Sequence, residues 1–280
     1  MEKYFDEGKN IEIVAKEIRV GKDVSFGSNV KIKLNGVFSI GDFSRLGNDT
    51  EILGHNVTIG SHLFHSSGLR VGGGGRENHT ANLTIGDRCT IHNNFINVCE
   101  PILIGDDVGL STEVAILTHG YWLSVLEGFP ASFAGVKIGS GVIIGYRSLI
   151  MMGAVIPEKT VIGAQSVVTK TLEKKGIYAG SPARFIKDIK PLTYDQKIAE
   201  ISRIIEDYKS KSVYRGVNTS QNLTLDYPLL TFKDFTFNVE TFEHSGAEDE
   251  DTDDFRDYIR KWGIRIYTDR GFKSKPFVVD

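Results

Sequence analysis

Aliphatic residues recur every six positions in the middle of the chain. The longest unbroken run consists of Ile138, Ile144, Ile150, Ile156, Ile162 and Val168. Small or β-branched residues stand four positions after its first five members: Val142, Ser148, Ala154, Thr160 and Ser166. A six-residue period matches neither the turn of an amphipathic helix nor the strict alternation of a half-buried strand. The pattern therefore predicts short flat segments that repeat around a shared core.

The same six-residue unit recurs earlier in the chain, where glycine follows the core residue. It appears at Val20-Gly21, Phe26-Gly27, Ile40-Gly41, Leu46-Gly47, Ile59-Gly60, Ile85-Gly86 and Ile104-Gly105. We expect three units to form one triangular coil, with the core side chain inside and glycine, asparagine or aspartate at corners where φ is positive. Each coil buries its core only against a neighbouring coil, so the predicted fold is an all-β solenoid.

Two insertions interrupt the repeat, one near residues 72–82 and the other near residues 118–136. With the units grouped in threes, both fall between the third side of one coil and the first side of the next. We therefore expect both loops to leave one edge of the prism, two coils or about 10 Å apart. In the coil before the first insertion, either Phe64 or His65 faces inward. Long loops on a rigid scaffold commonly carry function.

The repeat stops before residue 190, and residues 192–211 show helical spacing instead. Their apolar stripe consists of Ile198, Ile201, Ile205 and Tyr208. We expect this helix to pack on the coil or on a neighbouring subunit.

The last part of the chain, residues 213–280, lacks the six-residue period. Residues 232–242 alternate like a strand, residues 253–262 predict a short helix with an acidic start, and residues 264–267 predict another strand. The chain thus divides into a solenoid domain of residues 1–188, a helix of residues 189–212 and a small α/β appendage of residues 213–280.

Composition and charge argue against a nucleic-acid-binding, membrane-spanning or secreted protein. The 280 residues carry 33 basic and 36 acidic side chains, so the near balance gives no indication of a nucleic-acid or anionic-membrane partner. We find no apolar run that could span a bilayer and no secretion-signal pattern. Two cysteines, Cys89 and Cys99, are too few for a secreted disulfide scaffold. The expected location is the cytoplasm.

The repeated [Leu/Ile/Val]-Gly-x-x-small-x unit resembles the hexapeptide-repeat acyltransferases over roughly residues 10–188. Residues 167–170 (Val-Val-Thr-Lys) and 179–184 (Ala-Gly-Ser-Pro-Ala-Arg) match the closing elements of that family, with Ser181 at the variable position. The resemblance implies a left-handed parallel β-helix and a homotrimer with active sites between adjacent prisms. It also implies acetyl-coenzyme A as co-substrate, with no metal.

The second insertion contains a Thr118-His119 dipeptide. A dipeptide of this kind supplies the catalytic histidine in the family, so the resemblance implies that His119 is the base. A neutral imidazole suits this role at cytoplasmic pH, and general-base assistance contributes about 10²–10⁴ in rate. Glu113 and Glu127 are alternative carboxylate partners. The competing interpretation is a loop histidine without a role.

Several residues are candidates for contacts with the acceptor or the oxyanion. Asn93 and Asn94 supply amide donors, or else serve only as corner residues. Tyr121 and Trp122 pack against a sugar ring or the pantetheine arm, or else anchor the loop. Further candidates for contact with the acceptor are Glu127 and the polar side chains of the first insertion, Arg70, Arg76, Glu77 and His79.

The coenzyme groove is assigned by resemblance alone. The backbones at Tyr146 and Ala164 align with its wall, and Lys170, Arg184 and Lys187 are candidates for the coenzyme phosphates. The alternative for these cations is solvated surface charge.

The sequence is compatible with four functions. The first is O-acetylation of a sugar, oligosaccharide or polysaccharide, such as a bacterial surface glycan or its precursor, by direct transfer. The second is N-acetylation of a nucleotide-linked amino sugar. The third, a hydratase of the γ-carbonic anhydrase kind, requires three zinc-binding histidines, of which His92 and His119 supply two. The fourth, a non-catalytic solenoid, does not require the Thr118-His119 dipeptide.

Overall fold

A computed structural model of the chain describes residues 1–75, 77–219 and 223–277. It divides into two compact units, Met1–Ile189 and Lys190–Asp280. Each unit has a hydrophobic core of its own, and each is described by itself.

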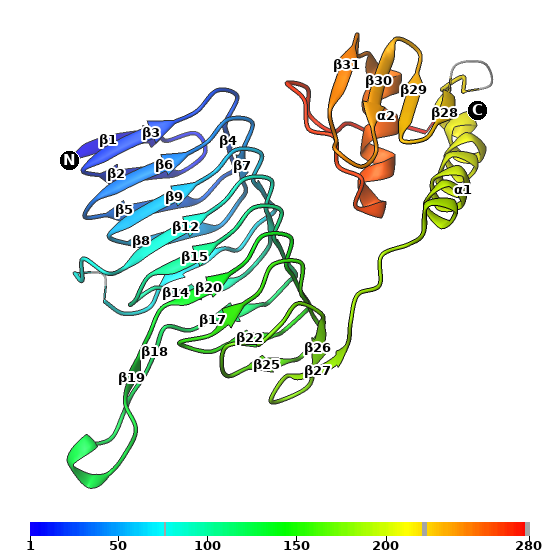
Figure 1. The fold of residues 1–280 in the computed structure, drawn as a ribbon. Helices are drawn as coiled ribbons and strands as arrows, with labels where there is room; N and C mark the ends of the chain where they lie inside the picture. The colour runs from blue at the N-terminus through cyan, green and yellow to red at the C-terminus, as the bar shows by residue number, and fades with distance from the viewer. Residues whose placement is uncertain (76, 220–222, 278–280) are drawn as a thin grey trace. The chain divides into compact units, whose positions relative to one another are not determined.

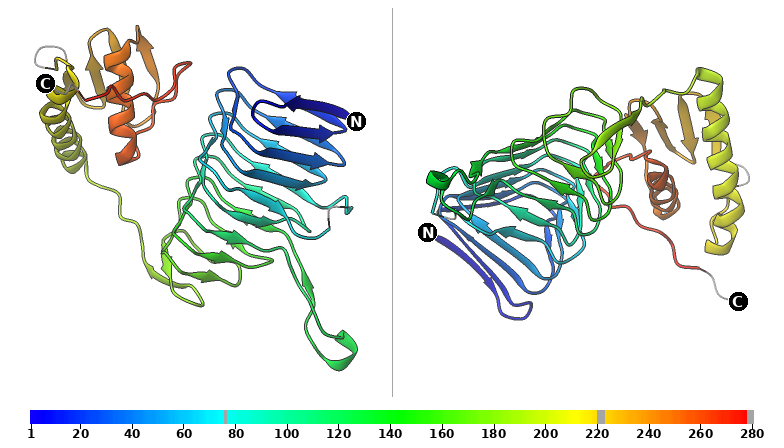
Figure 2. Two further views of the ribbon diagram at one scale, coloured as in Figure 1. Left: turned by 180° about the vertical axis from the view of Figure 1, so that it is seen from behind. Right: turned by 90° about the horizontal axis from the view of Figure 1, so that it is seen from below.

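Three sheets run the length of the first unit (Figures 1 and 2). The first sheet contains β1 (Glu2–Asp6), β2 (Ile11–Ala15), β5 (Val30–Leu34), β8 (Thr50–Gly54), β11 (Arg70–Gly72), β14 (Phe95–Asn97), β17 (Ala115–Ile116), β22 (Leu149–Ile150) and β25 (Val167–Val168). The second contains β3 (Glu17–Val20), β6 (Val37–Ile40), β9 (Asn56–Ile59), β12 (Asn82–Ile85), β15 (Ile102–Ile104), β20 (Val136–Ile138) and β23 (Val155–Ile156). The third contains β4 (Ser25–Phe26), β7 (Arg45–Leu46), β10 (Phe64–His65), β13 (Thr90–Ile91), β16 (Gly109–Leu110), β21 (Ile143–Ile144), β24 (Val161–Ile162), β26 (Ile177–Ala179) and β27 (Arg184–Lys187).

The chain visits the three sheets in rotation, so each turn from β2 to β24 is a three-sided coil. Pairing between coils is parallel, while β1 with β2 and β26 with β27 pair antiparallel at the two ends. In the second sheet the registers stack the buried side chains of Ile59, Ile85, Ile104, Ile138 and Ile156 on one another. This stacking is the arrangement that the six-residue period predicts.

The glycine after the core residue allows successive coils to approach closely. A Cβ on Gly60 would lie 2.3 Å from Oδ1 and 2.7 Å from the backbone N of Asp87, in the next coil. Asp87 Oδ1 accepts a hydrogen bond from Ser61 N at 2.8 Å. A side chain at position 60 would therefore displace the aspartate that caps this corner.

His65 is the inward residue of β10, because its side chain is fully buried while that of Phe64 is exposed. Its Nδ1 accepts a hydrogen bond from Gly47 N at 3.0 Å. Its Nε2 has no hydrogen-bond partner among the described residues. Burial in the coil lowers the pKa of His65 from 6.5 to about 4, so the imidazole is neutral in the core.

A hairpin arm projects from the coil between β17 and β20 (Figure 1). It consists of β18 (His119–Gly120) and β19 (Ser132–Phe133), paired antiparallel, with the 3-10 helix η1 (Val125–Glu127) between them. Ser124 caps η1 by accepting a hydrogen bond from Leu126 N, and Gly128 ends it at positive φ.

The second unit combines a four-stranded antiparallel sheet with helices on it (Figure 2). In chain order its elements are α1 (Tyr194–Ser212), η2 (Val213–Arg215), β28 (Leu223–Asp226), β29 (Leu229–Phe232), β30 (Phe235–Asn238), β31 (His244–Gly246), α2 (Glu250–Ile259) and η3 (Arg260–Trp262). Phe235 and Phe237 are both buried on one face of β30, as their alternation predicts, but the strand spans only Phe235–Asn238 and turns interrupt the rest of residues 232–242. No helix among the described residues is long and apolar enough to cross a membrane.

One prediction for this unit stays untested and another is wrong. The apolar stripe of α1 is buried within the second unit, where Tyr208 packs on Phe232 and Phe255. Packing of this helix on the coil or on a neighbouring subunit stays a prediction. Helical spacing shows that a face is buried but not against what. Residues 264–267 form no strand: the carbonyl of Ile266 accepts a hydrogen bond from the buried Arg256 side chain at 3.0 Å, in place of a ladder partner.

Candidate active site

The two insertions meet at one edge of the coil. The first connects β11 to β12 and the second connects β17 to β20, so both run from the first sheet to the second. A Cβ on Gly74 would lie 3.0 Å from Cε1 of His119, and φ of Gly74 is +138°. The glycine run of the first insertion therefore lies directly against the imidazole of the second, which confirms that the loops leave the same edge.

Aromatic rings hold the His119 side chain at the base of the arm. The imidazole stacks on Phe133, its partner in the hairpin, with centroids 5.9 Å apart, and lies 5.6 Å from Tyr121. Its Nδ1 is buried and has no hydrogen-bond partner among the described residues. Because Nδ1 is enclosed, proton exchange with a substrate would go through Nε2.

A buried hydrogen-bond network joins the two loops beneath His119. Asn97 Nδ2 donates to Gly73 O at 2.8 Å, and the Thr118 hydroxyl donates to Asn97 O at 2.9 Å. The same hydroxyl accepts from Cys99 N at 2.8 Å. Asn97 is only 4% exposed and Thr118 is fully buried, so the network fixes the residue that precedes His119.

Sequence reasoning missed Asn97 as a site residue. It occupies the inward position that follows Ile85 and Ile91 by the six-residue spacing, where the repeat calls for an aliphatic side chain. A buried polar group needs partners, and here they are the loop backbone and the dipeptide. The sequence did contain a signal for this site: a polar residue, Asn97, at an inward position of the coil that lies between the two insertions.

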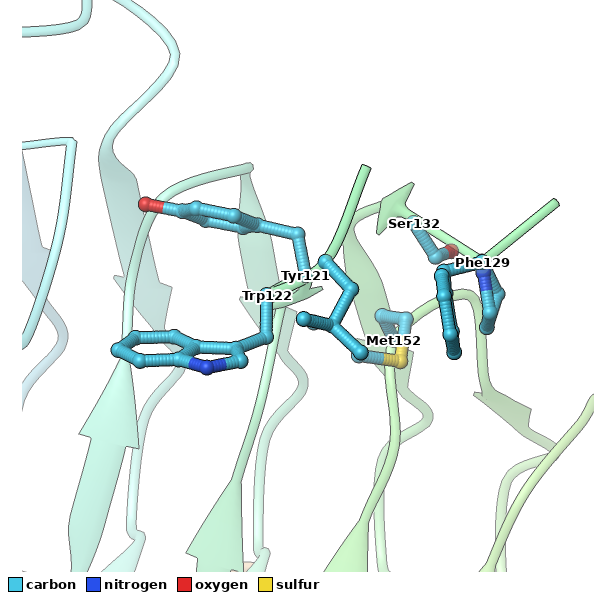
Figure 3. Close-up of a pocket in the computed structure, with 8 residues that line it drawn as sticks. Tyr121, Trp122, Phe129, Ser132 and Met152 are labelled. Atoms are coloured by element: carbon cyan, nitrogen blue, oxygen red, sulfur yellow. The ribbon is translucent and has the colours of Figure 1, made fainter. Parts of the chain in front are cut away.

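A cavity of about 500 Å³ opens along the arm, and its lining begins at Gly120, the residue after His119. Figure 3 shows Tyr121 and Trp122 extending to one side, with Phe129 and Ser132 across Met152 from them. Trp122 is 90% exposed and Leu126 is 94% exposed. Large apolar side chains gathered on such a projection indicate a contact surface and not a folding core.

The two candidate carboxylates do not contact His119 in this chain. Glu113 is paired with Arg147, which stacks on Tyr146 at 4.9 Å. Glu127 lies in η1 and is exposed. No hydrogen bond therefore fixes the His119 tautomer among the described residues, and ring packing alone orients it.

Asn93 and Asn94 lie at the opposite edge of the first sheet, at the turn between β13 and β14. Asn94 is buried: its Nδ2 donates to Ser111 O at 2.7 Å, and its Oδ1 accepts from His92 N at 2.8 Å. Asn93 is exposed. The bonds of Asn94 match the corner interpretation, because its amide is already used to close the turn.

The residues assigned to the coenzyme groove also lie away from His119 within one chain. Tyr146 and Ala164 are exposed at turns that lead from the third sheet to the first, whereas the arm leaves the far edge of the first sheet. The side chains of Lys170, Arg184 and Lys187 are exposed and follow the last coils. One chain does not bring the imidazole and these five residues together.

The first insertion and the remaining histidines add little to this site. Glu77 and His79 are exposed, Arg70 stacks over Phe95 at 5.9 Å, and Arg76 lies outside the described residues. His92 bonds to Ser66 Oγ at 2.9 Å, at the edge opposite His119. Within residues 1–75, 77–219 and 223–277 no group of three metal-ligating side chains occurs.

Two curated relatives decide the family. Galactoside O-acetyltransferase of Escherichia coli (strain K12) is 28% identical over 144 residues, which are 49% of this chain and 63% of that protein. Protein CapG of Staphylococcus aureus is 36% identical over 123 residues, 41% of this chain and 70% of CapG. The chain belongs to the hexapeptide-repeat acetyltransferase family. No protein-family model matches it, and it spans less than two thirds of the length of the galactoside enzyme.

Solved structures of hexapeptide-repeat and related acyltransferases also align with the chain. A variant of AntD, an N-acyltransferase from Bacillus cereus in complex with dTDP and coenzyme A, aligns with a TM-score of 0.41 and 24% identity, over 69% of this chain and 91% of that one. The maltose O-acetyltransferase from Clostridium difficile 630 aligns with a TM-score of 0.32 and 24% identity, over 64% and 70%. The assignment to the acetyltransferase family rests on the two sequence relatives.

Proposed function

We propose that this chain is an acetyl-coenzyme A-dependent O-acetyltransferase that acts on a hydroxyl of a sugar, oligosaccharide or polysaccharide. The observation that carries the proposal is His119, whose Nδ1 is buried, whose ring stacks on Phe133 and lies against Gly74, and which directly precedes Gly120 in the lining of the cavity along the arm. Family membership supports acetyl transfer, and the named substrate class of the galactoside enzyme supports a sugar acceptor.

The transfer is direct and passes through one tetrahedral intermediate. Nε2 of His119 takes the proton of the acceptor hydroxyl while the oxygen attacks the thioester carbonyl carbon. Collapse of the intermediate breaks the carbon–sulfur bond, and the leaving thiolate takes the proton back from the imidazolium. The products are an acetyl ester and free coenzyme A. This role requires the neutral tautomer with hydrogen on Nδ1.

A homotrimer of left-handed coils completes the site in this proposal. Within one chain, His119 and the groove residues Tyr146 and Ala164 lie at opposite edges of the first sheet. A neighbouring prism would place its groove beside the arm, with Lys170 and Arg184 near the coenzyme phosphates. The exposed apolar side chains of the arm support such a contact.

An acceptor screen with acetyl-coenzyme A tests the proposal. Sugars, oligosaccharides and nucleotide-linked amino sugars are offered separately, and free thiol release is followed. We expect release with a hydroxyl acceptor, and a product whose acetyl group is removed by mild alkali. An alkali-stable acetyl product would establish N-acetylation of an amine instead. No thiol release with any acceptor would overturn the assignment.

A further inference from the structure

A second cavity, of about 380 Å³, lies entirely within the second unit. The side chains of Ile201 and Ile204 from α1 contribute a buried apolar floor. Trp262 and Tyr227 add aromatic walls. The volume and the mainly apolar lining with a few polar groups are typical of small-ligand sites.

Trp262 offers a ring face that is held in place but remains accessible. Its side chain is 42% exposed. The Arg203 guanidinium lies 4.5 Å and the Lys261 ammonium 5.4 Å from the ring centroid, and Glu200 binds that guanidinium. The ring is therefore preorganised by a cation that is itself fixed by a carboxylate.

The polar rim centres on Glu240. Its Oε1 accepts hydrogen bonds from the Tyr227 hydroxyl at 2.6 Å and from Lys197 Nζ. These are its bonds to described side chains, so Oε2 keeps its lone pairs for a ligand. The bond from Lys197 holds the pKa of Glu240 below its usual value, and the carboxylate therefore stays ionised at neutral pH.

The side chains that line the cavity favour a sugar over a phosphate-containing ligand. The described residues of the cavity lining contain one lysine, Lys197, which is paired with Glu240, while Glu200 is paired with Arg203, so they offer no unpaired cation to a phosphate or a nucleoside diphosphate. A pyranose ring presents a C–H face that packs on an aromatic ring and hydroxyls at its edge that hydrogen-bond to a carboxylate and an ammonium.

We infer that this cavity binds one sugar residue of the acceptor glycan, apart from the residue that is acetylated. The inference rests on the proposed function for the identity of the glycan. Because the two units belong to one chain, binding here raises the local concentration of a polymeric acceptor without adding contacts to the catalytic base.

Tryptophan fluorescence measures this binding without catalysis. The chain has two tryptophans, so the Trp122→Phe variant reports Trp262 alone. The variant is titrated, without acetyl-coenzyme A, with galacto-, malto- and chito-oligosaccharides and with UDP-sugars. We expect saturable quenching by an uncharged or amino oligosaccharide.

The Glu240→Gln change should weaken this binding about ten- to hundredfold, as expected for a lost charge-assisted hydrogen bond. It should raise KM for the oligosaccharide acceptor and leave kcat for a monosaccharide unchanged. Glu206→Gln, an exposed residue of α1 paired with Lys209, is the matched control and should change neither.

The outcomes separate this inference from the proposed function. Thiol release from oligosaccharides that leave Trp262 emission unchanged would overturn the second sugar site and keep the acetyltransferase. Quenching only by UDP-sugars would also overturn it. Saturable quenching by an oligosaccharide that Glu240→Gln weakens, in a protein that acetylates none of the acceptors, would support the cavity as a sugar site and overturn the proposed function.

Discussion

The regular coils bury their apolar side chains, whereas the His119 arm exposes them. In the coils each core residue is stacked on its equivalents above and below and is fully buried, as Ile144 and Ile150 are. In the arm, Trp122 and Leu126 are almost fully exposed. The coils therefore derive their stability from burial, whereas the arm places its apolar groups where another molecule can contact them. Changes in the coils should affect folding, and changes in the arm should affect activity.

The largest effect is expected at the base of the arm. His119→Ala removes the general base, so turnover should fall about 10²–10⁴-fold. Coenzyme A binding, oligomer mass and unfolding temperature should be unchanged, because His119 contributes nothing to the coil interior. His244→Ala, an exposed change in the second unit, is the control. Turnover near that of the wild type in His119→Ala would remove the mechanism.

Neighbouring isoleucines in β21 test the coil. Ile144 is fully buried, and Ile143 is 49% exposed on the outer face. Ile144→Ala should lower the free energy of unfolding by about 2–5 kcal/mol through lost burial and a cavity, measured by guanidinium unfolding followed by circular dichroism. Ile143→Ala should change it by less than about 0.5 kcal/mol. Equal losses at both positions would contradict the coil packing.

The buried imidazole of His65 makes coil stability depend on pH. Its folded pKa of about 4 lies below the ordinary 6.5, so between these values the unfolded chain binds more protons than the folded one. Stability present above pH 6.5 is therefore lost as pH falls toward 4, by up to about 3 kcal/mol. Unfolding free energies at pH 7 and pH 4.5 should differ less in His65→Leu than in the wild type. Identical pH slopes would refute a neutral core histidine.

Asn97 connects the coil to the arm, so a change there should have an intermediate effect. Asn97→Leu removes the side-chain partners of Gly73 O and of the Thr118 N–H, at a cost of about 1–3 kcal/mol. We expect faster hydrogen exchange at residues 118–120 and a turnover lowered about tenfold, with exchange in β21 and β22 unchanged. Uniform loosening of all coils would show that Asn97 supports the core generally and not the loops.

The smallest effect on folding is expected at the exposed part of the arm. Trp122→Ser should alter the free energy of unfolding by less than about 0.5 kcal/mol, because its side chain packs on little of its own chain. If the arm contacts a neighbouring subunit, light scattering should detect dissociation of this variant at a higher protein concentration than the wild type. Unchanged association would show that Trp122 makes no contact needed for assembly and lines only the cavity along the arm.

Much of the solenoid was predictable because the inward positions follow from the spacing of residues within each short segment of sequence. Side chains alternate along short strands and corners recur every six residues, so Ile138 to Val168 identify inward positions without knowledge of any distant contact. The same counting placed both insertions, the second of which contains His119, at one edge of the coil. His119 as the base, the coenzyme groove, the left hand of the coil and the trimer came from family resemblance and stay predictions.

The tertiary structure decided what depends on residues that are distant in sequence. Whether Phe64 or His65 faces inward, and that Asn97 binds Gly73, follow from how one coil stacks on the next. The apolar stripe of α1 predicted a buried face, but only the folded second unit shows that Phe232 and Phe255 pack against it. Likewise, the separation of His119 from Tyr146 across the first sheet appears only when the coils close. A periodic sequence specifies which side chains turn inward, but the partners that they meet are set by the packing of the whole chain.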